Sequence, residues 1–279
     1  MDIEIIEMAE RKAKFILKNS SPAMANALRR TLLSDIPKMA IDKVEFHLGP
    51  IMDDSGKEYE SVTPLFDEII AHRLGMIPVP TDLELFGFQE DCACGGEGCP
   101  NCSIMYSLNK IGPCTVLSGD LMPLGNPDLK VKDEFIPIVE LTDGQAVLIY
   151  AHAKMGTAKQ HVKWQVCNGV GYSYMPVITV VPEKAGDEDA LKIVQESKSD
   201  VFAIEDGKIV VKNPINCSDY IDTIDRLTEM GAIEVHGDES QFIFKFETDG
   251  SLTAQQALDK AVEILADEAK DFKAQIEAL

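Results

Sequence analysis

The chain has 279 residues and a formal net charge of -21, from 47 acidic against 26 basic side chains. A 45% hydrophobic fraction is typical of a protein that buries a core, and the length suffices for one large domain or roughly two to three small ones. The charge disfavours direct binding to DNA or RNA, because that requires clustered Lys and Arg to displace counterions. A basic protein partner or a salty cytoplasm fits it better.

Targeting signals are not expected in this sequence. Its first residues, Met1-Asp2-Ile3-Glu4, lack the basic region and long apolar run of a signal peptide. No apolar stretch approaches the roughly 18 residues needed to span a membrane. We therefore expect a cytoplasmic chain without membrane association. Its seven cysteines are unevenly placed, which in such a chain argues for a metal site rather than a disulfide framework.

The N-terminal part predicts two short strands within 2–18, then a helix. Ser21 fits the N-cap and Pro22 the first helical position. Pro37 is expected to end the helix, and a strand is expected over 39–48. The apolar residues of the helix recur every four positions and form one stripe: Met24, Leu28, Leu32 and Ile36.

A second helix is predicted from Thr63 to Leu74, with Thr63 as its cap and Pro64 at its first position. Residues 104–181 contain many short β-type runs without a competing helical period. These runs predict a mostly β region.

Composition shifts after Pro182, where residues 183–189 are highly charged and predict a linker. A small unit is expected to follow, to about residue 237. Inside it, Asp206-Gly207 lies between two β-type runs, which is a strong β-hairpin signal.

The C-terminal part predicts a strand over 241–248, with Phe242, Phe244 and Phe246 on one face, and then a long helix. Thr253 and Gln256 have the spacing of a capping box. The apolar residues of the helix alternate in steps of four and three, the pattern of a coiled-coil seam. They are Leu258, Val262, Leu265, Ala269, Phe272, Ile276 and Leu279.

A cysteine cluster has the spacing C-x-C-x4-C-x2-C and consists of Cys92, Cys94, Cys99 and Cys102. Four neighbouring thiolates, with glycines that let the backbone turn, suit one tetrahedral structural zinc. Four cysteines close the coordination shell, so a catalytic zinc is not expected. Four free or disulfide-paired thiols are the alternative. A deaminase site is not supported, because His72 is followed by Arg73 and Leu74 rather than by the His-x-Glu of that family.

The unit at 183–237 has one cysteine, Cys217. Bacterial-type ferredoxins carry further cysteines three, six and ten residues later, where this chain has Tyr220, Thr223 and Leu227. A single thiol cannot hold a [4Fe–4S] cluster, so we expect a ferredoxin-like unit without an iron–sulfur cluster. An unrelated small α+β domain is the alternative.

No catalytic residue is predicted. The five histidines are scattered and form no dyad with a cysteine or carboxylate. Neither a phosphate-binding glycine loop nor a nucleophile motif is recognisable.

Two stretches carry a family resemblance. Residues 26–41, NALRRTLLSDIPKMAI, are similar to the signature helix and strand of the α/D-type subunits of RNA polymerase. Residues 67–78, DEIIAHRLGMIP, resemble a second hallmark of the archaeal and eukaryotic members. The cysteine cluster lies where those members carry zinc. With these three features the chain resembles the archaeal D-type family of DNA-directed RNA polymerase subunits, related to the bacterial alpha subunit, over its whole length.

The resemblance implies an α+β fold in three parts. A two-part dimerisation domain would comprise 1–45 plus 238–279, and an inserted mostly β domain with the zinc loop would comprise 46–182. The ferredoxin-like α+β domain would comprise 183–237, departing from the family pattern by its missing cluster cysteines.

In function, the resemblance implies a non-catalytic assembly subunit. The seam of the C-terminal helix would contact a smaller subunit, L, and the heterodimer would be the platform for the large catalytic subunits. Basic side chains of the two signature stretches would contact a large subunit: Arg29, Arg30, His72 and Arg73. The cofactor would be one structural zinc, with no iron–sulfur cluster, no direct contact with nucleic acid and no membrane.

Two other classes of protein remain open on the residues alone. A redox or electron-transfer protein could use the metal–thiolate site, and a stand-alone zinc enzyme would need an open coordination position. Metal analysis separates the redox protein from the assembly subunit, because one zinc without iron supports the assembly subunit. The zinc enzyme would instead show turnover by the purified chain.

Overall fold

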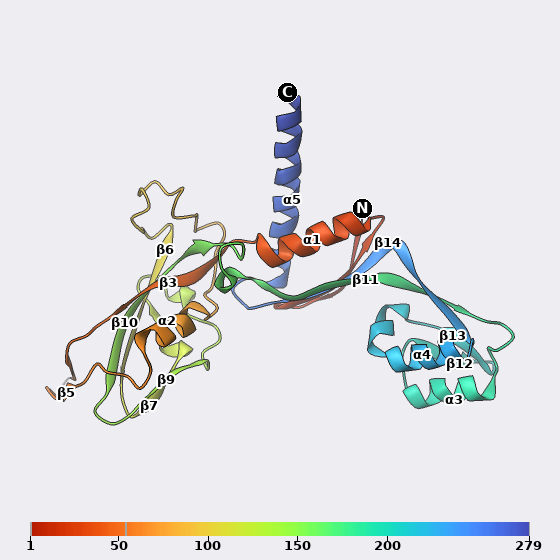
Figure 1. Cartoon of the computed structure of the whole chain (residues 1–279), viewed down its shortest axis with the longest axis horizontal. Coiled ribbons are helices and arrows are strands. Elements are labelled where there is room, and N and C mark those ends of the chain that lie inside the picture. Colours follow the sequence, from red (N-terminus) through yellow and green to blue (C-terminus); the bar gives the residue numbers. More distant parts are fainter. Residues whose placement is uncertain (1, 54, 279) are drawn as a thin grey trace. The chain divides into compact units, whose positions relative to one another are not determined.

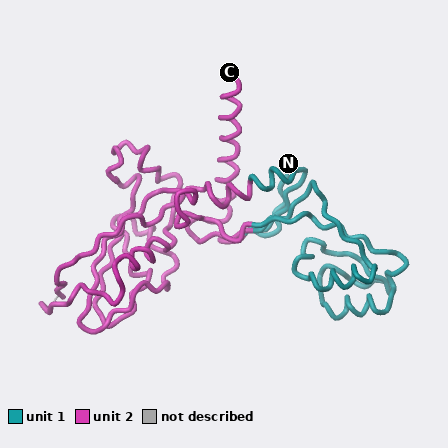
Figure 2. The backbone as a smooth tube through the Cα atoms, in the orientation of Figure 1, with its two compact units in different colours: residues 1–7, 13–27, 171–245 teal, residues 8–12, 28–170, 246–279 magenta. Residues whose placement is uncertain are grey.

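The computed structural model describes residues 2–53 and 55–278, which form a mixed α+β fold (Figure 1). This fold class was expected. The chain divides into two compact units, each assembled from separated stretches (Figure 2). Unit 1 comprises 1–7, 13–27 and 171–245, and unit 2 comprises 8–12, 28–170 and 246–279.

The N-terminal elements confirm the predicted order: strands β1 (Asp2–Met8) and β2 (Lys12–Lys18), helix α1 (Pro22–Ser34) and strand β3 (Lys38–Phe46). The Ser21 hydroxyl accepts a hydrogen bond from the Met24 amide at 3.3 Å, so the predicted cap is confirmed. The helix ends at Ser34, before Ile36. Pro37 disfavours helical geometry in the residue preceding it, which explains the earlier end.

Strands β1 and β2 belong to a four-stranded sheet of order β1-β2-β14-β11, with β11 (Cys167–Val180) and β14 (Ile233–Thr248). Phe242, Phe244 and Phe246 are all buried, as their shared face predicts. The ring of Phe15 stacks on Phe244 at 5.2 Å. Strand β14 begins before the expected residue 241, in a stretch of largely exposed residues without an apolar face, so sheet pairing rather than burial defines its first half.

Unit 2 contains the mostly β region that the sequence predicts. Strands β3, β10 (Ala146–Gly156), β6 (Ser103–Ile111) and β8 (Met122–Pro123) form an antiparallel sheet in that order. Two small sheets join β7 (Cys114–Leu117) to β9 (Pro137–Leu141) and β4 (Ile51–Met52) to β5 (Glu58–Tyr59). Short 3-10 turns η1 (Ser118–Asp120), η2 (Pro127–Leu129) and η3 (Val162–Trp164) connect the strands. Buried side chains such as Tyr106, Leu108 and Ile149 form the core.

Helix α2 (Asp67–Gly75) covers this core with Ile70 and Leu74. Its predicted start at Thr63 is wrong, because Thr63 lies four residues before the helix and its hydroxyl donates to the Leu65 carbonyl at 2.6 Å. Phe66 is the N-cap and has no side-chain cap bond. Acidic residues in the first turn interact favourably with the positive end of the helix instead.

The stretch after β11 folds into a small α+β layer with its own buried core. Asp187, in the predicted linker, caps α3 (Glu188–Ser197) by accepting from two backbone amides. The predicted hairpin is confirmed, because Asp206 and Gly207 have φ values of 49° and 70° between two paired strands. The remaining elements are β12 (Phe202–Glu205), β13 (Lys208–Val211), η4 (Pro214–Asp219) and α4 (Ile221–Glu229).

Helix α5 (Ala254–Glu277) ends the described chain, and the predicted capping box between Thr253 and Gln256 is present. Its first turns are anchored in unit 2, since the Ala254 amide donates to the Glu10 carbonyl at 2.8 Å. Just before the helix, the carboxylate of Asp249 pairs with the buried ammonium of Lys38. Across residues 2–53 and 55–278, no helix is long and apolar enough to cross a membrane.

Candidate metal centre and subunit interface

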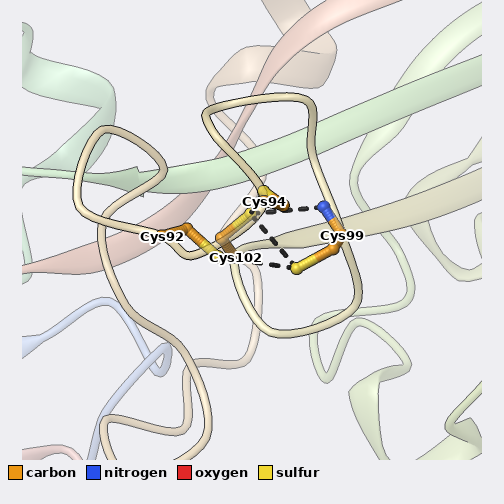
Figure 3. A group of neighbouring side chains, drawn as sticks. All are labelled: Cys92, Cys94, Cys99 and Cys102. Atoms are coloured by element: carbon orange, nitrogen blue, oxygen red, sulfur yellow. Dashed lines mark hydrogen bonds between the residues drawn. The ribbon is translucent and has the colours of Figure 1, made fainter.

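The four clustered cysteines converge in the loop between α2 and β6 (Figure 3). Their sulfur atoms all lie within 4.8 Å of one another. Three sulfur–sulfur distances are 3.5 Å for Cys92–Cys99, 3.7 Å for Cys94–Cys102 and 3.8 Å for Cys99–Cys102. A tetrahedral zinc with Zn–S bonds of about 2.3 Å separates its sulfurs by about 3.8 Å. The cluster therefore matches the size of such a site and can hold a metal ion.

Glycines give the loop the turns that bring the sulfurs together. Gly95, Gly96 and Gly98 have φ values of 69°, 86° and 87°, in the left-handed region that favours glycine. The Gly95 amide donates to the Cys92 carbonyl at 3.0 Å, and the Cys99 amide donates to the Cys102 sulfur at 3.3 Å. Backbone donors directed at sulfur are typical of thiolate–metal loops.

The thiols differ in their surroundings. Hydrogen bonding from the Gly98 backbone amide, chiefly, lowers the pKa of Cys94 to about 6. Burial raises the pKa of Cys102 to about 12. The loop thus favours a thiolate at one position and a neutral thiol at another when it is without a metal. A divalent cation would deprotonate the remaining thiols on binding, because thiolates are its ligands.

The other three cysteines do not join the cluster in the described part of the chain. Cys167 is buried, which raises its pKa to about 12, and Cys114 lies on β7. Cys217 packs against the core of the small α+β layer. Of the positions where ferredoxins carry further ligands, Thr223 and Leu227 are buried and Tyr220 packs against the same core.

The predicted seam on α5 is unevenly covered. Leu258 is 5% exposed within the chain, whereas Val262, Phe272 and Ile276 are 39%, 66% and 54% exposed. Leu265 is half-buried and Ala269 is exposed. Leu279 lies outside the described residues.

The four predicted large-subunit contacts lie on two helices. On α1, Arg29 is half-buried and Arg30 is exposed. On α2, both His72 and Arg73 are exposed, and the Arg73 guanidinium donates to the Ile138 carbonyl of β9.

One feature near α5 was not predicted. Phe88, which begins the cysteine loop, and Ile264 of α5 both line a cavity of about 370 Å³. The loop is closed beside Phe88, because the Gly87 amide donates to the Asn101 carbonyl at 3.1 Å. The sequence signal that could have indicated this cavity is Phe88 itself, an aromatic residue in an otherwise polar, glycine-rich loop.

Comparisons with known proteins agree over nearly the whole chain. Residues 14–269 match the family of the RNA polymerase Rpb3/Rpb11 dimerisation domain. The chain is 45% identical to DNA-directed RNA polymerase subunit Rpo3 of Thermoplasma volcanium, over 96% of each sequence. It is 43% identical to the Rpo3 subunit of Picrophilus torridus, over 94% of this chain and 95% of the relative. It is 37% identical to the Rpo3 subunit of Archaeoglobus fulgidus, over 100% of this chain and 98% of the relative.

Proposed function

Since this chain belongs to the archaeal Rpo3 family of RNA polymerase subunits, built on the Rpb3/Rpb11 dimerisation domain, we propose that it pairs with a smaller subunit, L, through α5. It is an assembly subunit of DNA-directed RNA polymerase, and the family carries no catalytic site. Polymerisation of nucleotides belongs to the large subunits. The contribution of this chain is to bring them together.

The observation that carries the proposal is the exposed C-terminal half of α5. Val262, Phe272 and Ile276 continue the four–three repeat into solvent. In Figure 1, no other described element of unit 2 runs beside this half of the helix. Burying an aliphatic or aromatic side chain stabilises by roughly 1.5–3 kcal/mol. A partner helix that covers these three side chains therefore explains why the apolar repeat continues beyond the part of α5 that the chain itself buries.

We assign the dimerisation domain to 1–45 plus 238–279, the inserted mostly β domain to 46–182, and a ferredoxin-like domain to 183–237. In this arrangement both signature helices contribute basic side chains to a large catalytic subunit: Arg29, Arg30, His72 and Arg73. A chain of net charge -21 has little reason to contact nucleic acid directly. In this proposal the chain is located in the cytoplasm, together with the other subunits of the polymerase.

The metal in this proposal is one structural zinc on the four clustered cysteines. Three sulfur–sulfur distances of 3.5–3.8 Å support zinc, as do four thiolates with no position left for substrate. In the 183–237 domain no iron–sulfur cluster is proposed, since Leu227 and Thr223 fill positions where its ligands would stand. Metal analysis of protein purified under reducing conditions should find one zinc and no iron per chain.

The direct test is co-expression with the smaller subunit. The double variant Leu265→Asp, Phe272→Asp places two charges in the proposed seam. We expect it to fold but to lose copurification, because a buried unpaired charge is strongly unfavourable. Met122→Asp with Leu124→Asp is a matched control, since both side chains are about half exposed and lie outside α5. Equal copurification of the two double variants would show that the seam is not the interface.

A further inference from the structure

A cavity of about 770 Å³ lies in unit 2, and neither the cysteine loop nor α5 contributes to its lining. Three segments line it: 48–50 after β3, 58–62 in and after β5, and the 142–145 turn between β9 and β10. Glu60 joins two of these walls, since its amide donates to the Gly144 carbonyl at 3.0 Å and its carbonyl accepts from the Ala146 amide at 2.9 Å. Backbone hydrogen bonds therefore fix these two walls to each other.

Aliphatic side chains line this groove without cover. Leu48 is 80% exposed and Val62 is 63% exposed. Single exposed aliphatic residues are ordinary, but these two share one concave site. Covering either would contribute roughly 1.5–3 kcal/mol. The groove thus has two apolar contact points for a side chain supplied from outside.

Backbone groups beside Val62 are also available. Within the described residues, the amides of Ser61 and Val62 have no backbone hydrogen-bond acceptor. They directly follow Glu60, which pairs in parallel with Gln145. Backbone amides without an acceptor, next to a residue in a β-bridge, can pair with a strand from another chain.

The charge of the groove lining indicates which kind of strand from another chain would bind there. Glu58, Glu60 and Asp143 line the groove, and no Lys or Arg does so among the described residues. In the part of the chain that the structure describes, none of these three carboxylates forms an ion pair. The neighbouring ammonium of Lys57 lies 4.7 Å over the ring of Tyr59. Such a lining repels phosphate groups and acidic peptides and attracts a basic segment.

We propose that this groove binds an extended, basic segment of another protein chain. The segment pairs its backbone with residues 61–62 and places an aliphatic side chain against Leu48 and Val62. Its Lys or Arg side chains meet the three carboxylates. The inference rests on the proposed function in one respect, namely that within the polymerase the segment belongs to another subunit.

Two labelled seven-residue peptides test the groove on the purified full chain by fluorescence anisotropy. One alternates Lys with Val, and the other alternates Lys with Gly at the same charge. We expect the Lys–Val peptide to bind at least about tenfold more tightly, the ratio that corresponds to burying one small aliphatic side chain. Equal affinities would overturn the proposal, because attraction by the net charge alone would then explain binding.

Val62→Asp supplies the matched variant. It adds a negative charge, so unspecific attraction of a basic peptide would increase, whereas loss of the apolar contact should weaken Lys–Val binding about tenfold. Leu124→Asp, which adds the same charge at a half-exposed residue outside the groove, should not weaken the binding. An unchanged affinity in Val62→Asp would also overturn the proposal.

The same variants separate this inference from the proposed heterodimer. Val62→Asp should copurify with the smaller subunit at the wild-type level, and Leu265→Asp with Phe272→Asp should still bind the Lys–Val peptide. In assembled polymerase, a photoreactive amino acid at position 62 should cross-link to a Lys- or Arg-rich segment of another subunit. A cross-link to nucleic acid or to an acidic segment would contradict the groove's assignment.

Discussion

The two halves of α5 share one apolar repeat but have different surroundings. In the N-terminal half, Ala254, Ala257, Leu258 and Ala261 are buried in the chain itself. From Val262 to Ile276, the large apolar side chains are half-buried or exposed. The small residues of the first half allow close packing on unit 2, while the second half presents Phe272 and Ile276 to solvent.

One apolar repeat can therefore pack against two different partners along the same helix. A four–three repeat requires a neighbour along one face of the helix, and it does not specify whether that neighbour belongs to the same chain. Mutations in the two halves should accordingly change different quantities. In the first half they should change the stability of the chain, and in the second half the affinity for a partner.

The largest expected effect comes from metal removal. Phe88 of the cysteine loop and Ile264 of α5 line the same cavity, near the junction of the two halves. Structural zinc supplies on the order of 10–16 kcal/mol of apparent binding energy in small peptides. Chelation should therefore increase hydrogen exchange across 88–104. The amides of the first half of α5 should stay protected, because the core around Tyr106 and Ile149 takes only Ile104 from this stretch.

In the absence of chelator, Cys99→Ser should cause the same increase in hydrogen exchange across 88–104. Cys114→Ser, outside the cluster, is the matched control. Global unfolding on chelation would show that unit 2 depends on the metal, and unchanged exchange at 88–104 would show that the loop does not.

A smaller effect is expected from Leu258→Ala. Leu258 is 5% exposed, and removing a buried leucine side chain leaves a cavity that typically costs about 2–5 kcal/mol. Urea unfolding of the isolated chain should show a loss of stability in this range. A loss below about 1 kcal/mol would show that Leu258 contributes as little to the stability of the isolated chain as the residues of the second half of α5.

Thr253→Ala should cost about 1 kcal/mol, because it removes the N-cap of α5. The Thr253 hydroxyl accepts from the Gln256 amide at 3.2 Å, and the Gln256 side chain accepts from the Thr253 amide at 3.0 Å. Thr253→Ser keeps the oxygen and should stay near wild type in the same urea titration. Equal losses in both variants would exclude the cap as the cause.

The smallest effect on the isolated chain is expected from Phe272→Ala. Phe272 is 66% exposed, and substitutions of exposed residues usually change stability by less than about 0.5 kcal/mol. The same variant should weaken pairing with the smaller subunit, as measured by a titration of one chain with the other. A stability loss comparable to that of Leu258→Ala would remove the distinction between the halves.

Local signals in the sequence predicted local structure well. The capping box at Thr253, the left-handed turn at Asp206-Gly207 and the shared face of Phe242, Phe244 and Phe246 all depend on neighbouring residues and are confirmed. The convergence of the four cysteines followed from their spacing in the same way. Where tertiary contacts decide, prediction was weaker. Thr63 has the type and spacing of a cap, but α2 begins four residues later, at Asp67.

Other features had no readable sequence signal. The burial of Leu258 and the exposure of Phe272 depend on where unit 2 ends beneath α5, which the repeat does not encode. The groove at Leu48 and Val62 joins three segments that are distant in the sequence. Its existence depends on the pairing of Glu60 with Gln145, a bridge between a short strand and a turn.

Hydrogen–deuterium exchange of the α5 amides, measured on the isolated chain and on its complex with the smaller subunit, tests the proposed heterodimer most directly. Amides over 254–261 should be protected in both samples, because the chain itself buries that half. Amides over 262–276 should exchange rapidly in the isolated chain and become protected in the complex. Equal exchange of 262–276 in the two samples would contradict an interface on α5.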